Sequence, residues 1–163
     1  MTTYTWYSEP VPAHLPVRQV WGYCFDGQGR VLLRVDQDGC GLPGGRPEPG
    51  EAGFAETLIR EDMEETQTLL SQISYLGYQE VDDEDGSPLY AQVRMIALIT
   101  EIRPAAPDPD TGSVHGRLLA GAARAEELLA WGENGRPQIA AAMALAQDRL
   151  GVPSHDPAAD LIV

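Results

Sequence analysis

The stretch GGRPEPGEAGFAETLIREDMEETQ, residues 44–67, joins a loop rich in glycine and proline to a segment with helical spacing. Near its end lie three glutamates, Glu61, Glu64 and Glu65, three and four residues apart. On a helix this spacing puts the carboxylates on one side, with neighbouring Cβ atoms about 5–6 Å apart. Carboxylates this close repel one another, and Mg²⁺ is held by oxygen ligands of this kind, usually together with substrate phosphates. The cluster therefore indicates a site for a divalent metal and a phosphate.

The helical spacing begins near Phe54 and predicts a helix that ends near Gln67. At 100° per residue one predominantly apolar face collects five residues: Ala55, Leu58, Ile59, Met63 and Thr66. The three glutamates fall to one side of this face, and Asp62 points into its middle. A buried lone carboxylate is unfavourable unless it is paired or protonated. Asp62 therefore either finds a partner or enlarges the acidic site.

The flanking sequence mixes strands and helices without strict alternation, which favours a layered α/β/α sandwich with a mixed sheet over a doubly wound parallel sheet. Residues 1–16 are expected to form an extended N-terminal arm, 17–151 the folded domain and 152–163 a loose C-terminal tail. Within the domain we predict strands at 17–26, 31–35, 73–81 and 89–102, helices at 122–131 and 137–151, and loops at 36–53, 82–88 and 104–116.

The charge balance narrows the possible partners. The chain has 163 residues and a formal net charge of −14, and all 11 of its basic residues are arginine. A surface this acidic repels a phosphate backbone, so nucleic acid is not expected as a partner. No apolar run approaches the roughly 20 residues that span a bilayer, and the N-terminus does not resemble a signal peptide, so we expect a cytoplasmic protein with no membrane partner.

The cysteines and tryptophans carry little functional signal. Cys24 and Cys40 form neither a disulfide framework nor a zinc motif, so we expect two free thiols. The three tryptophans, Trp6, Trp21 and Trp131, are expected to be packing residues.

GGRPEPGE followed by LIREDMEET resembles the signature of the Nudix hydrolases. That signature is a glycine, five residues, a glutamate, seven residues, then Arg-Glu-aliphatic-any-Glu-Glu, any residue and glycine. Gly45 and Glu51 match its first half with the expected spacing. The second half is matched by Arg60, Glu61, Glu64 and Glu65. The resemblance implies the family's α/β/α sandwich over residues 17–150.

Three departures from the signature bear on the site. Eight residues, not seven, separate Glu51 from Arg60, which leaves open whether these two side chains still meet. Asp62 stands where the family has an aliphatic residue. Gln67 replaces the closing glycine, so we expect that end of the helix to be built differently.

The resemblance implies an enzyme that uses Mg²⁺ or Mn²⁺ to hydrolyse the pyrophosphate bond of a nucleoside diphosphate linked to another moiety. Its partner would be a small-molecule nucleotide. By this likeness Glu61 and Glu65 hold the metal, and Glu64 completes the cluster or acts as the base. Arg60 orients the carboxylates, and the backbone of Gly44 and Gly45 lies close to metal or phosphate.

The sequence leaves several alternatives open. The general base could also come from Asp108, Asp110 or the 82–85 run, and His115 lies in a loop that could rim a pocket. The degenerate signature also suits a catalytically impaired Nudix domain that binds nucleotides or regulates. A homodimer is possible, because the proline-rich arm could reach a second subunit.

Overall fold

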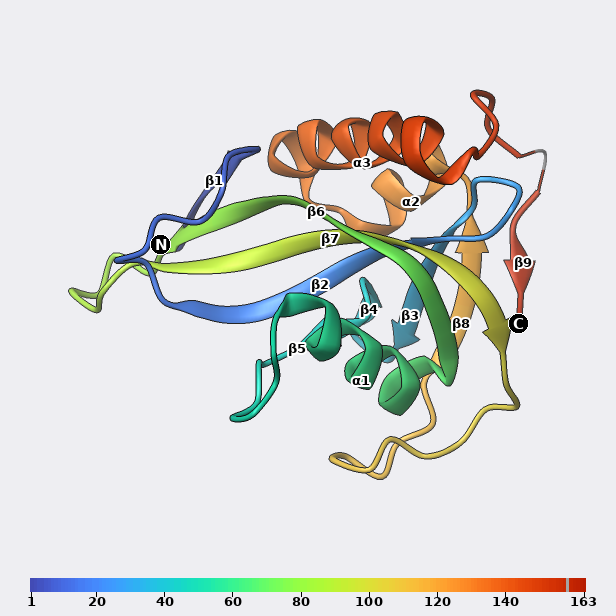
Figure 1. Ribbon diagram of the computed structural model, residues 1–163, viewed down its shortest axis with the longest axis horizontal. Coiled ribbons are helices and arrows are strands. Elements are labelled where there is room, and N and C mark those ends of the chain that lie inside the picture. The colour runs from blue at the N-terminus through green and yellow to red at the C-terminus, as the bar shows by residue number, and fades with distance from the viewer. Residues whose placement is uncertain (158) are drawn as a thin grey trace.

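A computed structural model of the chain describes residues 1–157 and 159–163 (Figure 1). Helix α1 (Phe54–Thr66) covers one face of a central sheet, and α2 (Ala122–Leu129) and α3 (Gly135–Leu150) cover the other. The described residues form one nine-stranded sheet: β1 (Thr3–Tyr7), β2 (Val17–Phe25), β3 (Val31–Asp36), β4 (Gly39–Gly41), β5 (Gly44–Gly45), β6 (Thr68–Asp82), β7 (Tyr90–Ile102), β8 (Gly116–Ala120) and β9 (Leu161–Ile162). The predicted α/β/α sandwich is confirmed.

The strand order is β1-β6-β7-β2-β3-β8-β9, with β4 paired to β3 and β5 paired to β2. Strands β2 and β7 run parallel at the centre, with Val20 opposite Val93, and the other pairs are antiparallel. The sheet is therefore mixed, as the sequence predicts. The two strands predicted at 17–26 and 31–35 form β2 and β3, which pair only at Phe25 and Val31, and β3 pairs mainly with β8.

Alternation along β2 divides the core between the two faces of the sheet. Tyr23 and Phe25 belong to the apolar cluster under α2 and α3, whereas Val20 and Cys24 belong to the cluster under α1. Both clusters are fully closed to solvent at these positions. The cluster under α1 includes Leu58 of the helix, so packing on the sheet holds α1 against β2.

Three segments differ from the sequence-based expectation. The N-terminal arm forms strand β1, which pairs with β6 of its own chain, and the tail expected to be loose contains β9, which pairs with β8. Strand β8 was not predicted, because GRLLA is short and carries the charged Arg117 as its second residue. No helix in residues 1–157 or 159–163 is long and apolar enough to cross a membrane.

Candidate active site

Helix α1 faces the sheet through Leu58, which lies over Gly22 of β2. A Cβ atom at Gly22 would lie 2.7 Å from Leu58, so glycine there lets the helix approach closely. This contact fixes the rotation of the helix and buries Leu58, Asp62 and Thr66. The predicted apolar face is wrong at Ile59, which is 47% exposed, because the helix is rotated toward its acidic side.

Asp62 finds a partner on the sheet side of the helix. It is fully buried, and the Sγ of Cys24 donates to its Oδ2 at 3.3 Å. Its Oδ1 has no hydrogen-bond partner among the described residues. Burial raises the pKa of Asp62 well above its ordinary value, which favours the protonated acid, and burial beside Asp62 raises the pKa of Cys24 as well. Asp62 therefore belongs to the core and does not enlarge the acidic site.

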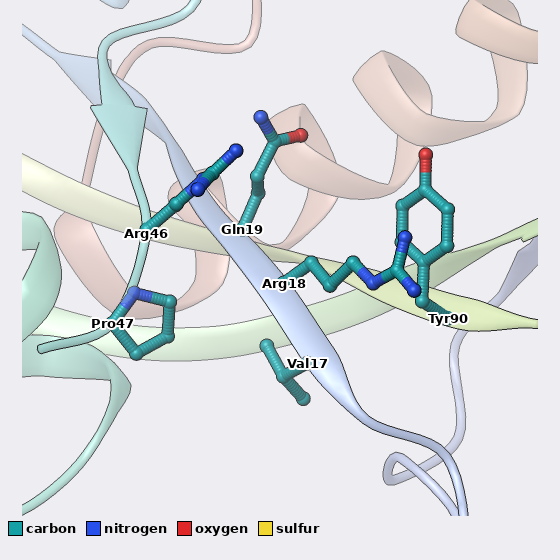
Figure 2. Close-up of a pocket in the computed structure, with 6 residues that line it drawn as sticks. All are labelled: Val17, Arg18, Gln19, Arg46, Pro47 and Tyr90. Atoms are coloured by element: carbon teal, nitrogen blue, oxygen red, sulfur yellow. The ribbon is translucent and has the colours of Figure 1, made fainter. Parts of the chain in front are cut away.

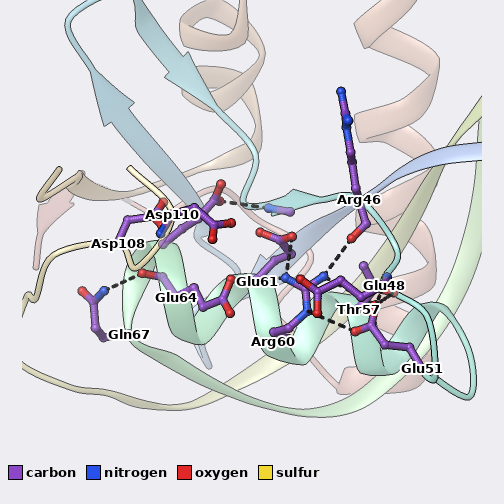
Figure 3. Close-up of polar contacts among 12 residues, drawn as sticks. Arg46, Glu48, Glu51, Thr57, Arg60, Glu61, Glu64, Gln67, Asp108 and Asp110 are labelled. Carbon is purple, nitrogen blue, oxygen red and sulfur yellow. Dashed lines mark hydrogen bonds and ion pairs between the residues drawn. The ribbon is translucent and has the colours of Figure 1, made fainter. Parts of the chain in front are cut away.

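Arg60 links the loop to the acidic helix face (Figure 3). Its guanidinium donates to Glu51 at 3.2 Å, to Glu61 at 2.8 Å and to Glu64 at 3.2 Å. It also donates to the backbone carbonyl of Arg46 at 2.8 Å. Five donors in a planar fork allow one arginine to make these contacts at once. The role of Arg60 suggested by the signature, to orient the carboxylates and tie down the loop, fits this geometry.

The extra residue between Glu51 and Arg60 does not separate them. Ala52 and Gly53 are exposed, and Gly53 is extended immediately before the first residue of the helix. The insertion is therefore taken up before the helix begins. The hydroxyl of Thr57 donates to Glu51 at 3.0 Å and helps to hold its carboxylate in reach of Arg60.

The other end of the acidic face is tied to the glycine loop. Glu65 accepts from Arg34 of β3 at 2.6 Å and from the backbone N–H of Gly44 at 3.1 Å. A Cβ atom at Gly45 would lie 2.4 Å from Oε1 of Glu61. The two glycines therefore lie directly against the carboxylates, because no side chain separates the backbone from the acids.

Burial shifts Glu61 and Glu65 toward their neutral forms. It raises the pKa of Glu65 to about 7, although Arg34 and the Gly44 N–H oppose the shift. Burial also raises the pKa of Glu61, and the neighbouring charges of Glu64 and Asp110 add to this against the effect of Arg60. The cluster has more negative charge than its two arginines balance, so an added cation would be stabilised there.

Gln67 closes the helix in the left-handed conformation usually taken by glycine, with φ of 54°. Its side-chain amide donates to the carbonyl oxygens of Glu64 at 3.0 Å and Ala106 at 3.2 Å. Its Oε1 accepts from the N–H of Ala106 at 3.1 Å. These three bonds offset the backbone cost of a left-handed glutamine, which explains how the helix ends without the signature's glycine.

The loop at 104–115 approaches the acidic face (Figure 3). His115 contacts Asp36 through Nδ1 and Asp108 through Nε2, the latter at 3.1 Å. Burial disfavours the charged imidazole, but the hydrogen bonds to these two carboxylates outweigh it and raise the pKa of His115. Asp108 is thus engaged by His115, whereas Asp110 is exposed and close enough to Glu61 to affect its pKa. The 82–85 run lies at the distant β6–β7 hairpin (Figure 1).

The donor chemistry of the cluster fits a divalent metal, although no three acids among the described residues already converge as a metal site. Glu61 and Glu64 each bond Arg60 through one oxygen, which leaves Oε2 of Glu61 and Oε1 of Glu64 without a hydrogen bond in the described part of the chain. Hard oxygen ligands beside an unsubstituted Gly45 backbone suit Mg²⁺ or Mn²⁺. Binding would require the acids to turn these free oxygens inward.

An aromatic cavity lies on the opposite face of the sheet from α1. Trp21 and Trp131 stack with ring centroids 6.1 Å apart, and the buried guanidinium of Arg94 lies 4.5 Å above the ring of Trp21. Together with neighbouring polar side chains they line a cavity of about 340 Å³. Trp6, Trp21 and Trp131 all pack against the core cluster under α3, as expected, but Trp21 and Trp131 also line this cavity.

The family model for the NUDIX domain matches residues 15–137. The fold, the match and the acidic helix agree: the chain belongs to the Nudix hydrolase family. Among solved structures it is similar to a pyrophosphohydrolase from Bacillus subtilis, with 27% identity and a TM-score of 0.56. That similarity covers 64% of this chain and 65% of the other, so it spans slightly less than two thirds of the Bacillus protein.

Two further structures share the fold at lower identity. A Nudix hydrolase from Nitrosomonas europaea has a TM-score of 0.61 and 18% identity, with 85% of this chain and 93% of that chain covered. The Ap4A hydrolase of Caenorhabditis elegans has a TM-score of 0.51 and 16% identity, with 80% and 98% covered. No curated protein sequence matches the chain.

Sequence reasoning missed Arg34, which holds Glu65 from a separate strand. The signal was present, because an arginine inside the apolar run VLLRV is unexpected unless its charge is paired. It also missed Arg94, another arginine inside an apolar strand, for which the same argument applies.

Proposed function

We propose that the protein is a hydrolase dependent on Mg²⁺ or Mn²⁺ that cleaves the pyrophosphate bond of a nucleoside diphosphate linked to another moiety. The observation that carries this proposal is the contact of Gly45 with Glu61, in a cluster where Arg60 also orients Glu64. Carboxylates held against bare backbone form a place where a metal and a phosphate can meet.

In this proposal the chain's own residues position the reacting groups. Glu61, Glu64 and Glu65 would hold the cation, which neutralises phosphate oxygens and lowers the pKa of water when it is bound. Arg60 keeps the glycine loop at a fixed distance from the helix. A water molecule attacks phosphorus, the bond from phosphorus to the bridging oxygen breaks, and two phosphorylated products leave. Glu64 or Asp110 would accept the proton of that water.

The cavity lined by Trp21, Trp131 and Arg94 supports the proposal that the substrate is a nucleotide. Its aromatic wall suits the flat face of a nucleobase, and Trp21 and Trp131 also line a second cavity, of about 320 Å³, that includes Gly44. A nucleotide whose base lies in the aromatic cavity could thus extend its phosphates toward the glycine loop.

The test is hydrolysis of a panel of nucleoside diphosphate compounds with Mg²⁺ or Mn²⁺, measured for the wild type and Glu65→Gln. We expect Glu65→Gln to lower kcat/KM by more than about 100-fold, since even residues that only support a metal ligand contribute 10–100-fold. Glu133→Gln removes an exposed carboxylate elsewhere and serves as the control. Because burial raises the pKa of Glu65 to about 7, metal affinity should also fall as pH decreases below 7.

A second candidate is a nucleotide-binding or regulatory domain without turnover. Its support is the engagement of the acids by arginines: Arg34 contacts Glu65, and Arg60 contacts both Glu61 and Glu64. If no compound in the panel is hydrolysed, and nucleotide binding is the same in Glu65→Gln and the wild type, this second function replaces the first.

A further inference from the structure

A pocket of about 540 Å³ lies beside the glycine loop and is lined by Val17, Arg18, Gln19, Arg46, Pro47 and Tyr90 (Figure 2). We propose that this pocket is a polyphosphate subsite, which binds phosphates beyond the two that flank the bond to be cleaved. The inference rests on the proposed function, and it narrows the substrate class to nucleotides with three or more phosphates. Its support comes from Arg46, Arg18 and Gln19.

The first support is that two arginines face this pocket without counter-ions. The chain carries 25 acidic residues against 11 arginines, and six of the arginines form ion pairs within the described residues. Arg46 forms no ion pair there and its guanidinium makes no hydrogen bond, whereas Arg18 only stacks on the ring of Tyr90 at 4.3 Å. In so acidic a protein, two exposed arginines that share a pocket mark a local positive region.

The second support is the position of Arg46. Its backbone carbonyl accepts from Arg60 at 2.8 Å, and it directly follows Gly45, which lies against Glu61. Figure 3 shows its side chain pointing away from the carboxylates, and Figure 2 shows it beside Gln19 in the pocket. The same residue therefore joins the acidic cluster, through its backbone, to the pocket, through its guanidinium. A phosphate on Arg46 would be next to those at the cluster.

The third support is the orientation of Gln19, which a chain of hydrogen bonds determines. Arginine can only donate, so Nε of Arg94 requires Oε1 of Gln138 as its acceptor, at 3.0 Å. Nε2 of Gln138 then donates to Gln79 at 2.8 Å, Gln79 to Gln92 at 3.0 Å, and Gln92 to Oε1 of Gln19 at 2.7 Å. Each amide in this series of hydrogen bonds is oriented by the one before it, so Oε1 of Gln19 accepts from Gln92. The Nε2 group of Gln19 remains as a hydrogen-bond donor for the pocket.

The pocket thus combines two guanidinium groups and one amide N–H₂ group, all of which recognise anionic oxygens. Asp83 of the β6–β7 hairpin lies close enough to raise the pKa of Tyr90, and Arg18 lies close enough to lower the pKa of Asp85 in the same hairpin. These two acids make the Arg18 side of the pocket less positive. We therefore assign the larger contribution to Arg46 and the smaller one to Arg18.

The experiment is calorimetric titration with inorganic tripolyphosphate in EDTA, which requires neither a metal nor turnover. We expect Arg46→Met to weaken binding by about tenfold or more and Arg18→Met to weaken it less. Gln19→Glu keeps an acceptor for Gln92 but replaces the donor with a carboxylate, so it should also weaken binding. Arg149→Met, the control, removes an equal charge at an exposed position of α3 and should leave binding unchanged.

Kinetics with nucleoside di-, tri- and tetraphosphates of one base provide a second measurement. The loss of kcat/KM in Arg46→Met should grow with the number of phosphates and appear mainly in KM. Equal loss for every chain length, or tripolyphosphate binding that does not depend on Arg46, would overturn the subsite while leaving the hydrolase intact. Tripolyphosphate binding that depends on Arg46, without hydrolysis of any nucleotide, would support the subsite and refute the proposed hydrolase function.

Discussion

Replacement of Asp62 tests whether a buried acid opposes folding at neutral pH. Its carboxyl is fully buried, with one weak thiol donor on Oδ2 and no partner for Oδ1 in the described structure. A buried polar group without a hydrogen bond costs about 1–3 kcal/mol. Asp62→Leu removes both the orphaned oxygen and the ionisable group, so we expect the free energy of unfolding at pH 7 to rise by at least about 1 kcal/mol.

The pH dependence gives a sharper version of this test. The folded pKa of Asp62 is raised above its unfolded value, so the acid holds its proton longer in the folded chain. Below the unfolded pKa both states are protonated and ionisation carries no penalty. As pH rises from there to the folded pKa, the free energy of unfolding should fall by about 1.4 kcal/mol per pH unit through this one group. Asp62→Asn, which cannot ionise, should lack that decline.

Urea unfolding followed by circular dichroism in EDTA, at intervals from pH 4.5 to 8, measures both effects. The quantity of interest is the difference between wild type and Asp62→Asn at each pH, because the other titrating groups are shared. Asp38→Asn, at an exposed position, is the matched control and should run parallel to the wild type. If the free energy of unfolding of Asp62→Asn changes with pH as that of the wild type does, the account of this buried acid is refuted. It is also refuted if Asp62→Leu destabilises the protein at pH 7.

Four further substitutions have defined outcomes. Arg60→Lys should lower kcat/KM about 10–100-fold in steady-state assays, because one ammonium cannot reproduce the fork of contacts; a wild-type rate would contradict this. His115 has a raised folded pKa, so its stabilisation is complete below the unfolded pKa and is lost as pH rises through the folded value; His115→Gln should lack this loss in urea titrations. Gly45→Ala should abolish hydrolysis with little change in melting temperature, since the atoms nearest its Cβ belong to the end of the flexible Glu61 side chain. Gly44→Ala should instead lower the melting temperature, since its φ is 144° and its Cβ would lie 2.2 Å from a backbone oxygen; the reverse pattern would refute the distinction.

The sequence predicts the acidic helix and most of the sheet because those elements are long and periodic. Helix α1 and strand β2 lie within a residue or two of their predicted limits. Strand β8 was missed because five residues that include the charged Arg117 have no clear period, and its pairing with β3 is a long-range contact. Ile59 was misplaced because the rotation of α1 depends on Gly22, which lies more than 30 residues earlier in the chain.

In the candidate site, too, the local features were predicted from the sequence and the long-range contacts were not. Arg60 and the three glutamates all lie within residues 60–65, so helical spacing was sufficient to bring them together. The place of the Gly44 and Gly45 backbone was implied by the family resemblance and not by local spacing. Arg34 comes from another strand, and the pocket around Arg46 and Tyr90 joins β2, the glycine loop and the start of β7. Such contacts follow from strand order, which no local pattern specifies.

Gln67 has a consequence for motion near the site. Its side-chain amide forms hydrogen bonds with both the N–H and the carbonyl of Ala106. The start of the 104–115 segment is therefore held at the C-terminal end of α1. Any movement that brings Asp110 toward a ligand must therefore take place after Ala106, and the amide hydrogen of Ala106 should exchange slowly with solvent because it is bonded to Gln67.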